Sequence, residues 1–118
     1  MVKKVLLDTS FILSCIKQKI DFFNWLNNEG YSIIVPKQVL IELEGLSKSD
    51  LDVKIALNLI ERNKPSHLDL NNKNTDKAII NYSKKNPEII IATLDKEIKQ
   101  SINNKKLIIR QKSQLEIV

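Results

Sequence analysis

Cysteine, histidine and tryptophan each occur once in this sequence, and these scarcities exclude several kinds of site. A lone cysteine cannot form an internal disulfide, and the apolar neighbours of Cys15, Leu13 and Ile16, predict a buried thiol. His67 has no second histidine or cysteine near it, which argues against a zinc site. No apolar run approaches the roughly 20 residues of a membrane span, and the first residues do not resemble a signal peptide. We therefore expect a cytoplasmic protein with no membrane segment.

Glycine and proline are also rare, with two and three residues, and all five fall where a helix or strand is expected to begin or end. There is no internal repeat and no stretch with the composition of a linker. We therefore expect residues 1–118 to form a single domain, which is large enough to bury a substantial core.

The charge is positive overall, with 19 Lys or Arg against 14 Asp or Glu, and the excess lies in the second half of the chain. Residues 1–59 carry seven of each sign, whereas residues 60–118 carry twelve basic and seven acidic residues. A basic half suits a polyanion held through its phosphates, so a nucleic acid is a candidate partner. The alternative is a solvated, lysine-rich surface without a binding role.

Short apolar runs alternate with amphipathic stretches along the chain. This alternation is typical of βαβ units, and it predicts a three-layer α/β/α fold around a central, mostly parallel sheet of about five strands. The expected strands lie near residues 4–7, 31–35, 67–70, 88–94 and 107–109, with an edge strand at 115–118. The expected helices begin after residue 8 and lie near 22–26, 36–46, 51–62, 75–85 and 96–103.

Helix ends are marked by particular residues. Gly30 suits a left-handed C-terminal cap, and Pro36 suits the first turn of the helix that follows it. Ser49 is expected to cap one helix, with Asp52 at the third position, and Thr75 is expected to cap another.

Four acidic residues occupy unusual places in this pattern. Asp8 and Asp95 end apolar strands, Asp76 lies at a helix start, and Glu42 lies in the helix after the second strand. The carboxyl ends of parallel strands share one edge, where ligands bind. Carboxylates gathered there would repel each other by about 1 kcal/mol per pair at ~4 Å in water. A hard cation such as Mg²⁺ or Mn²⁺ relieves that repulsion, so a metal site is the leading interpretation.

Each acid also has a purely structural explanation. Asp8 and Asp95 could simply cap the helices that follow them, and Asp76 could interact favourably with a helix dipole. Glu42 competes with Glu44, because both lie at the margins of the apolar stripe, on opposite flanks. Helical periodicity does not choose between these two glutamates.

Four stretches together resemble the PIN-domain nuclease family, in the same order and spacing and over almost the whole chain. They are LLDTSF (6–11), VPKQVLIEL (35–43), NTDKAI (74–79) and IATLDKEI (91–98). The tail LIIRQK (107–112) is similar to archaeal members, including rRNA-processing and VapC-toxin-like proteins.

The resemblance implies cleavage of single-stranded RNA with one or two Mg²⁺ or Mn²⁺ ions, leaving a 3′-hydroxyl and a 5′-phosphate. It implies an acidic quartet in which Glu42 is preferred to Glu44, with two accessory pocket residues. The quartet is Asp8, Glu42, Asp76 and Asp95, and the accessory residues are Thr93 and Ser10. It also implies an antitoxin or a ribosome-assembly protein as partner, and a second copy of the chain in a homodimer.

Four lysines are candidates for holding the flanking phosphates of RNA, namely Lys73, Lys77, Lys96 and Lys99. Lys77 is also a departure from the family pattern, because many members carry a further acid at that position. This substitution is expected to weaken a second metal site.

Two other functions compete with the nuclease. A non-catalytic PIN-like module would bind RNA or a ribosome-assembly partner through the basic half of the chain. A phospho-acceptor signalling domain has a similar size and pattern, but such domains generally have an adjacent acidic pair after the first strand. Here Asp8 stands alone between Leu7 and Thr9.

Overall fold

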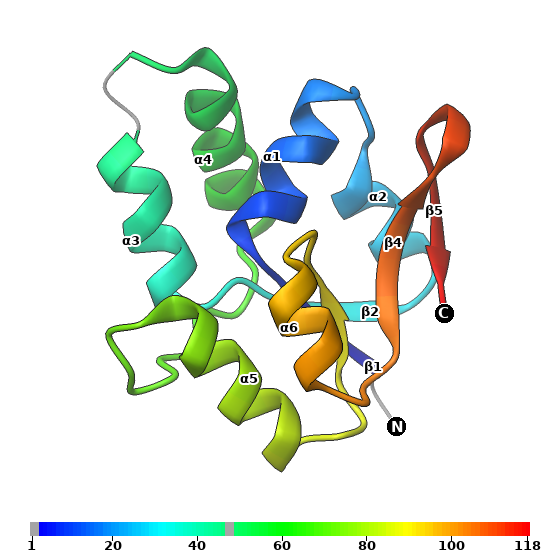
Figure 1. Cartoon of the computed structure of the whole chain (residues 1–118). Coiled ribbons are helices and arrows are strands. Elements are labelled where there is room, and N and C mark those ends of the chain that lie inside the picture. The colour runs from blue at the N-terminus through cyan, green and yellow to red at the C-terminus, as the bar shows by residue number, and fades with distance from the viewer. Residues whose placement is uncertain (1–2, 47–48) are drawn as a thin grey trace.

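A computed structural model describes residues 3–46 and 49–118. The structure has a five-stranded sheet in the order β2-β1-β3-β4-β5, in which only β5 is antiparallel to its neighbour. The expected three-layer α/β fold with a mostly parallel sheet is therefore confirmed (Figure 1). The strands are β1 (Lys3–Leu7), β2 (Tyr31–Ile34), β3 (Ile90–Ala92), β4 (Lys106–Arg110) and β5 (Gln114–Ile117).

Six α-helices formed by the described residues cover this sheet. They are α1 (Thr9–Lys17), α2 (Phe22–Asn28), α3 (Lys37–Leu46), α4 (Leu51–Asn63), α5 (Thr75–Lys85) and α6 (Lys96–Ser101). A short 3₁₀ turn, η1 (Gln111–Ser113), joins β4 to β5. Within the described residues, no helix has both the length and the apolar character that crossing a membrane would require.

Two hydrophobic cores lie on opposite faces of the sheet, because successive strand residues point to opposite sides. In β1, Val5 and Leu7 pack into the core formed with α1, α2, α3 and α4, whereas Leu6 packs into the core formed with α5 and α6. Figure 1 shows α1–α4 grouped apart from α5 and α6. Strands buried on both faces explain the continuous apolar runs of the sequence. Cys15 is fully buried, as expected.

The prediction of a strand at residues 67–70 is wrong. Residues 67–70 form no strand, and their segment contributes only an isolated parallel bridge between Ser66 and Ile34. This segment also forms hydrogen bonds with the start of α3. Lys37 N donates to Leu68 O at 3.0 Å, and Leu70 N donates to Gln38 Oε1 at 3.2 Å. The sheet still has five strands because the edge strand at the C-terminus is present.

The expected caps of two helices are displaced by one residue. Asp50, not Ser49, caps α4, and its Oδ1 accepts hydrogen bonds from the backbone of Asp52 and Val53. Asn74, not Thr75, caps α5 by accepting from Lys77 N at 3.0 Å. In both cases a side chain with a carbonyl-type oxygen precedes the helix and reaches its free N–H groups. Gly30 has a φ of 81° and follows α2, as its cap role predicts.

Candidate active site

Asp8 lies at the carboxyl end of β1, an interior strand of the sheet between β2 and β3. Its backbone N–H donates to Ala92 O at 2.9 Å, which holds it beside the end of β3. Its side chain is only 5% exposed and accepts three hydrogen bonds. Thr9 N donates to Oδ1 at 2.8 Å, and the hydroxyls of Thr93 and Ser10 donate to Oδ2 at 2.7 and 3.3 Å. Asp8 is therefore both a helix cap and a buried, oriented carboxylate.

Burial raises the pKa of the Asp8 carboxyl above its ordinary value of 3.8. The hydrogen bonds from Thr93 and Thr9 lower this pKa, because they stabilise the charged form, whereas the negative charges of Glu42 and Asp76 raise it. The balance remains upward. The pKa of Asp8 is thus affected by two acids, Glu42 and Asp76, that are 34 and 68 positions away in the sequence.

Asp95 reaches the same place from the neighbouring strand. β1 and β3 are adjacent and parallel, and the chain runs from Ala92 at the end of β3 through Thr93 to Asp95. Asp95 Oδ1 accepts from Ile98 N at 3.1 Å and so caps α6. The Thr93 hydroxyl accepts from Asp95 N at 3.1 Å while it donates to Asp8. One threonine hydroxyl therefore links the two aspartates.

Glu42 comes to the site on α3. Its Oε1 accepts a hydrogen bond of 2.6 Å from the Thr9 hydroxyl at the start of α1. Glu42 lines a cleft with Asp8, whereas Glu44 lies two residues further along α3 and lines neither this cleft nor the cavity beside it. The structure thus distinguishes the two glutamates that helical periodicity left equivalent.

Asp76 is exposed in the first turn of α5. The helix dipole favours a negative charge there, but Asn74 already provides the capping oxygen. The Asp76 carboxylate is therefore not needed as a cap, and it lines the same cleft as the other three acids.

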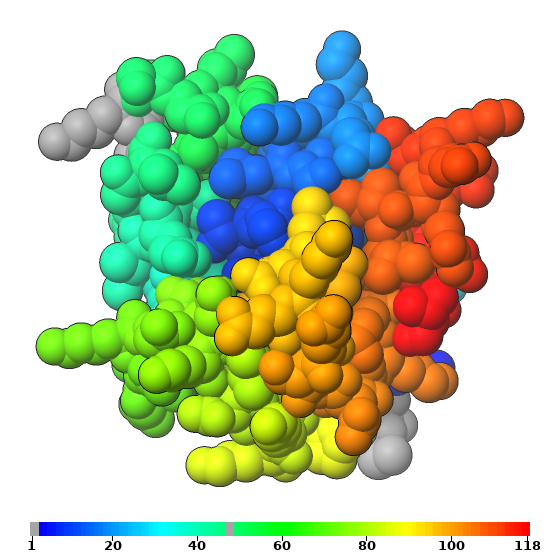
Figure 2. Space-filling model, in the orientation of Figure 1, coloured from blue at the N-terminus to red at the C-terminus, as the bar shows by residue number. Residues whose placement is uncertain are grey.

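The cleft that joins these residues has a volume of about 360 Å³. Its lining residues are Asp8, Thr9, Ser10, Glu42, Asp76, Leu94 and Asp95. Figure 2 shows the blue surface of the start of α1 lying between α3, α5 and the gold surface of α6. All four acids singled out from the sequence are thus brought to one cleft, from four different elements.

The carboxylates share the cleft without forming a closed cage. Across the part of the chain that the structure describes, no three acidic, histidine or cysteine side chains lie close enough to hold a metal ion together. The donor set nevertheless fits a hard cation, because it consists of carboxylate and hydroxyl oxygens around a buried carboxylate with acidic neighbours. Mg²⁺ usually keeps several waters and binds proteins through one or two carboxylates, with substrate phosphates completing its shell.

The hydroxyl groups have more partners than the sequence suggests. Ser10 Oγ accepts from Leu94 N at 3.1 Å, which ties the start of α1 to the segment after β3. The Asp-Thr-Ser sequence predicts hydroxyls that bond Asp8 or cap the helix. Thr9, however, directs its hydroxyl to Glu42, which is 33 positions away. Thr9 was not among the predicted site residues, and no local signal could identify this long-range partner.

The four candidate lysines do not converge. Lys73 lies in the loop before α5 and lines a second cavity, of about 730 Å³, next to the cleft. Lys77 is on α5, and Lys96 and Lys99 are on α6; these three line neither the cleft nor this second cavity. Of these four lysines, Lys73 alone lines a described cavity together with Glu42 and Asp76.

The fold and sequence match known proteins. The chain is 34% identical over 127 aligned positions to Ribonuclease VapC4 of Methanocaldococcus jannaschii, with 97% of this chain and 95% of that protein covered. It is 31% identical over 100 positions to the rRNA-processing protein fcf1 of Schizosaccharomyces pombe, with 83% of this chain covered. The chain spans about half of that yeast relative, namely 52% of its length.

Solved structures agree with these sequence matches. The structure of the PIN domain endonuclease Utp24 superposes with a TM-score of 0.82 at 26% identity, covering 97% of this chain and 90% of that chain. The family model described as "PIN like domain" matches residues 5–112, which include all four cleft acids. The chain therefore belongs to the PIN-like domain family.

Proposed function

We propose that this protein is a metal-dependent endoribonuclease that cleaves single-stranded RNA at the acidic cleft. The observation that carries the proposal is the convergence of Asp8, Glu42, Asp76 and Asp95 on one cleft. The pKa of Asp8 is raised by burial and by the nearby charges of Glu42 and Asp76. Such an arrangement is unfavourable for folding alone, and perturbed carboxylates in a cleft are typical of functional sites.

The chain's own groups divide into two roles. Asp8 and Asp95 are the proposed direct metal ligands, and Glu42 and Asp76 complete the site directly or through water. Thr93 and Ser10 orient the Asp8 carboxylate, and Thr9 orients Glu42. The described residues that line the cleft include no histidine or lysine, so its polar side chains are carboxylates and hydroxyls alone. A bound Mg²⁺ or Mn²⁺ would supply the activation of water and the neutralisation of phosphate charge.

The basic half of the chain supports a polyanionic substrate. Residues 60–118 contribute α5, α6 and the loop before α5, and they carry the whole excess of positive charge. We assign Lys73, Lys77, Lys96 and Lys99 to phosphates that flank the cleaved bond. Their long-range attraction raises the local concentration of RNA and falls with ionic strength.

Cleavage of a labelled single-stranded RNA tests the proposal directly. The wild-type chain is expected to cleave it with Mg²⁺ or Mn²⁺ and to stop when EDTA is added. Asp8→Asn and Glu42→Gln are expected to abolish cleavage, whereas Glu44→Gln, two residues away on the same helix, is expected to cleave like the wild type. Cleavage that survives in a purified protein carrying Asp8→Asn and Asp95→Asn together would rule out this site.

A second candidate function is a PIN-like module that binds RNA or a ribosome-assembly partner without cutting. Two observations favour it: no three described acidic, histidine or cysteine groups form a ready metal cluster, and Lys77 stands where many family members have another acid. Calorimetric titration with Mn²⁺ beside the cleavage assay separates the two functions. RNA binding with neither Mn²⁺ binding nor cleavage would identify the non-catalytic module.

The two named relatives are a ribonuclease, VapC4, and an rRNA-processing protein, fcf1. We propose that this chain acts as an RNA-processing nuclease or as the toxin of a toxin-antitoxin pair. An antitoxin or a ribosome-assembly protein is then its protein partner, with a homodimer as its assembly. Mapping the cleaved positions in total RNA distinguishes a ribosomal precursor from other RNA targets.

A further inference from the structure

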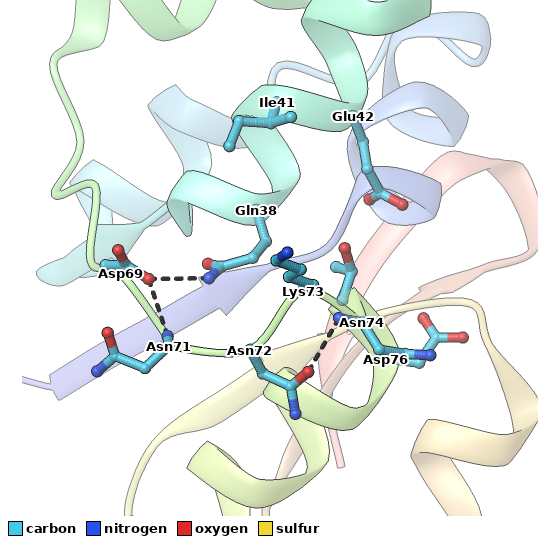
Figure 3. Close-up of a pocket in the computed structure, with 10 residues that line it drawn as sticks. Gln38, Ile41, Glu42, Asp69, Asn71, Asn72, Lys73, Asn74 and Asp76 are labelled. Atoms are coloured by element: carbon cyan, nitrogen blue, oxygen red, sulfur yellow. Dashed lines mark hydrogen bonds between the residues drawn. The ribbon is translucent and has the colours of Figure 1, made fainter.

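A second cavity lies directly beside the acidic cleft and shares Glu42 and Asp76 with it. Its volume of about 730 Å³ is within the range of small-molecule sites. One wall comes from α3, with Gln38, Ile41 and Glu42. The opposite wall comes from the loop before α5, with Asp69, Asn71, Asn72 and Asn74, and Lys73 lies between the two walls (Figure 3).

The loop wall is held in place by Gln38, which uses both ends of its amide. Its Nε2 donates to Asp69 Oδ1 at 2.9 Å, and its Oε1 accepts from Leu70 N at 3.2 Å. Asp69 Oδ1 also accepts from Asn71 N at 2.8 Å. These bonds lower the pKa of the Asp69 carboxyl, Asn71 first and Gln38 second. The loop is thus tied to α3 before any ligand arrives, and Gln38 is a positioning residue.

The side-chain amides of Asn71 and Asn72, next to these hydrogen bonds, have donor or acceptor groups available to a ligand. Within the described residues, no hydrogen bond engages the Asn71 side chain, and Asn72 uses only its Oδ1, which accepts from Asn74 N at 2.9 Å. An amide presents a donor and an acceptor side by side, which is the arrangement that pairs with the edge of a nucleobase.

Ile41 provides the apolar surface that such a ligand needs. Its side chain is 66% exposed on α3 and lines the cavity. The flat face of a base could cover this side chain and remove its apolar surface from water. The charges point to a neutral group, because the cavity is lined by Glu42, Asp69 and Asp76 against Lys73 alone.

We propose that the second cavity is a subsite for one unpaired nucleobase of the RNA, between Ile41 and the amides of Asn71 and Asn72, with Lys73 on the adjoining phosphate. The inference rests on the proposed function, because the shared Glu42 and Asp76 put this base next to the phosphodiester to be cleaved. The cavity then gives the enzyme a preference for one base at one position relative to the cut.

The test separates base recognition from cleavage. A randomised single-stranded RNA library is equilibrated with the full chain carrying Asp8→Asn, and the bound RNA is sequenced. One base should be enriched about tenfold at one position, since a good bidentate pair is worth roughly that factor or more. Asp8 does not line the second cavity, so this variant leaves the proposed subsite intact.

Two variants remove the amides with little change to the loop. Asn71 has a φ of 59°, so Asn71→Gly keeps its backbone conformation, and Asn72→Ser keeps an oxygen that can accept from Asn74 N. The double variant should lose the enrichment. Asn58→Ala, on the exposed face of α4, should keep it. Ile41→Ala should weaken RNA binding about fivefold, because it removes apolar contact area, and Ile55→Ala on α4 should leave it unchanged.

Two results would overturn the subsite, namely no enrichment in the Asp8→Asn protein or an enrichment that persists in the double variant. These results are independent of the cleavage assay. If the wild-type protein cuts RNA with no base preference, the nuclease proposal stands and the subsite proposal is wrong. If the protein enriches one base but never cuts RNA, the nuclease proposal is wrong and the subsite proposal stands.

Discussion

The Thr93 hydroxyl donates a hydrogen bond of 2.7 Å to Asp8 Oδ2, between two residues 85 positions apart in the sequence. Both groups are almost fully buried, with 1% and 5% of their surfaces exposed. The contact is possible because β1 and β3 are parallel neighbours that end at the same edge of the sheet. Thr93 thus helps to orient the buried carboxylate, and its hydrogen bond lowers the pKa of Asp8 against the larger, opposite effect of burial.

Thr93→Val should therefore alter the pH dependence of RNA cleavage. The hydrogen bond from Thr93 lowers the pKa of Asp8, so its removal should raise that pKa further. The carboxylate would then form only at a higher pH, and the acidic limb of the pH–rate profile should move upward. The change also leaves a buried acceptor with one partner fewer, which should lower the free energy of unfolding by about 1–3 kcal/mol.

Thr93→Ser is the matched control, because it retains the hydroxyl. Its pH–rate profile should coincide with that of the wild type. If the valine and serine variants show the same profile, the hydroxyl does not control Asp8.

Asp8→Asn should stabilise the protein at neutral pH. The folded state holds the Asp8 proton more tightly than the unfolded chain, so wild-type stability falls as the pH rises from 3.8 toward the raised pKa. Asparagine removes this loss and the repulsion by Glu42 and Asp76. We expect a gain of about 1 kcal/mol at pH 7, the scale of one exposed like-charge pair.

Urea unfolding at several pH values measures the effect. The two proteins should differ at pH 7 and converge well below pH 3.8, where the carboxyl is protonated in both the folded and the unfolded states. A difference that stays constant down to acidic pH would show that packing, and not charge, is responsible.

Thr9→Val should weaken metal binding without removing a proposed ligand. The Thr9 hydroxyl holds Glu42 Oε1 at 2.6 Å and connects α1 to α3. Partners of this kind typically change metal affinity by about 10–100-fold when they are lost. Calorimetric titration should show Mn²⁺ binding weakened by about tenfold. Thr9→Ser should bind as the wild type does, and equal affinities in all three proteins would contradict the role of Thr9.

The two glycines should respond in opposite directions to alanine. Gly30 has a φ of 81°, where an L side chain is strained, so Gly30→Ala should lower the free energy of unfolding by about 1 kcal/mol. Gly45 lies in α3, and a Cβ there would have no neighbour within 4 Å. Gly45→Ala should therefore raise the free energy of unfolding by about 0.5–1 kcal/mol.

Thermal unfolding of both variants gives the comparison. Space is open around both positions, so the contrast depends on backbone conformation alone. Equal effects in the same direction would mean that the backbone at residue 30 is not left-handed in solution.

The sequence by itself determined the order of the elements, apart from the absent strand at 67–70, and the end of β1. The apolar runs in β1 and β3 are continuous because each strand is buried on both faces, and this pattern depends only on the neighbours in the chain. Asp8 and Asp95 could be placed at a common edge for the same reason, since parallel strands end together.

Only the tertiary structure shows that Glu42 lines the cleft and accepts a hydrogen bond from Thr9 of another helix, because both Glu42 and Glu44 lie at the margins of the same helical stripe. The strand predicted after α4 is absent for a related reason: the backbone of this segment forms hydrogen bonds with the start of α3, about 32 positions earlier. Local periodicity reports which side of an element faces a core. It carries no information on which distant residue will be the hydrogen-bond partner of a polar side chain or a loop. Both the cleft and the second cavity depend on such long-range contacts.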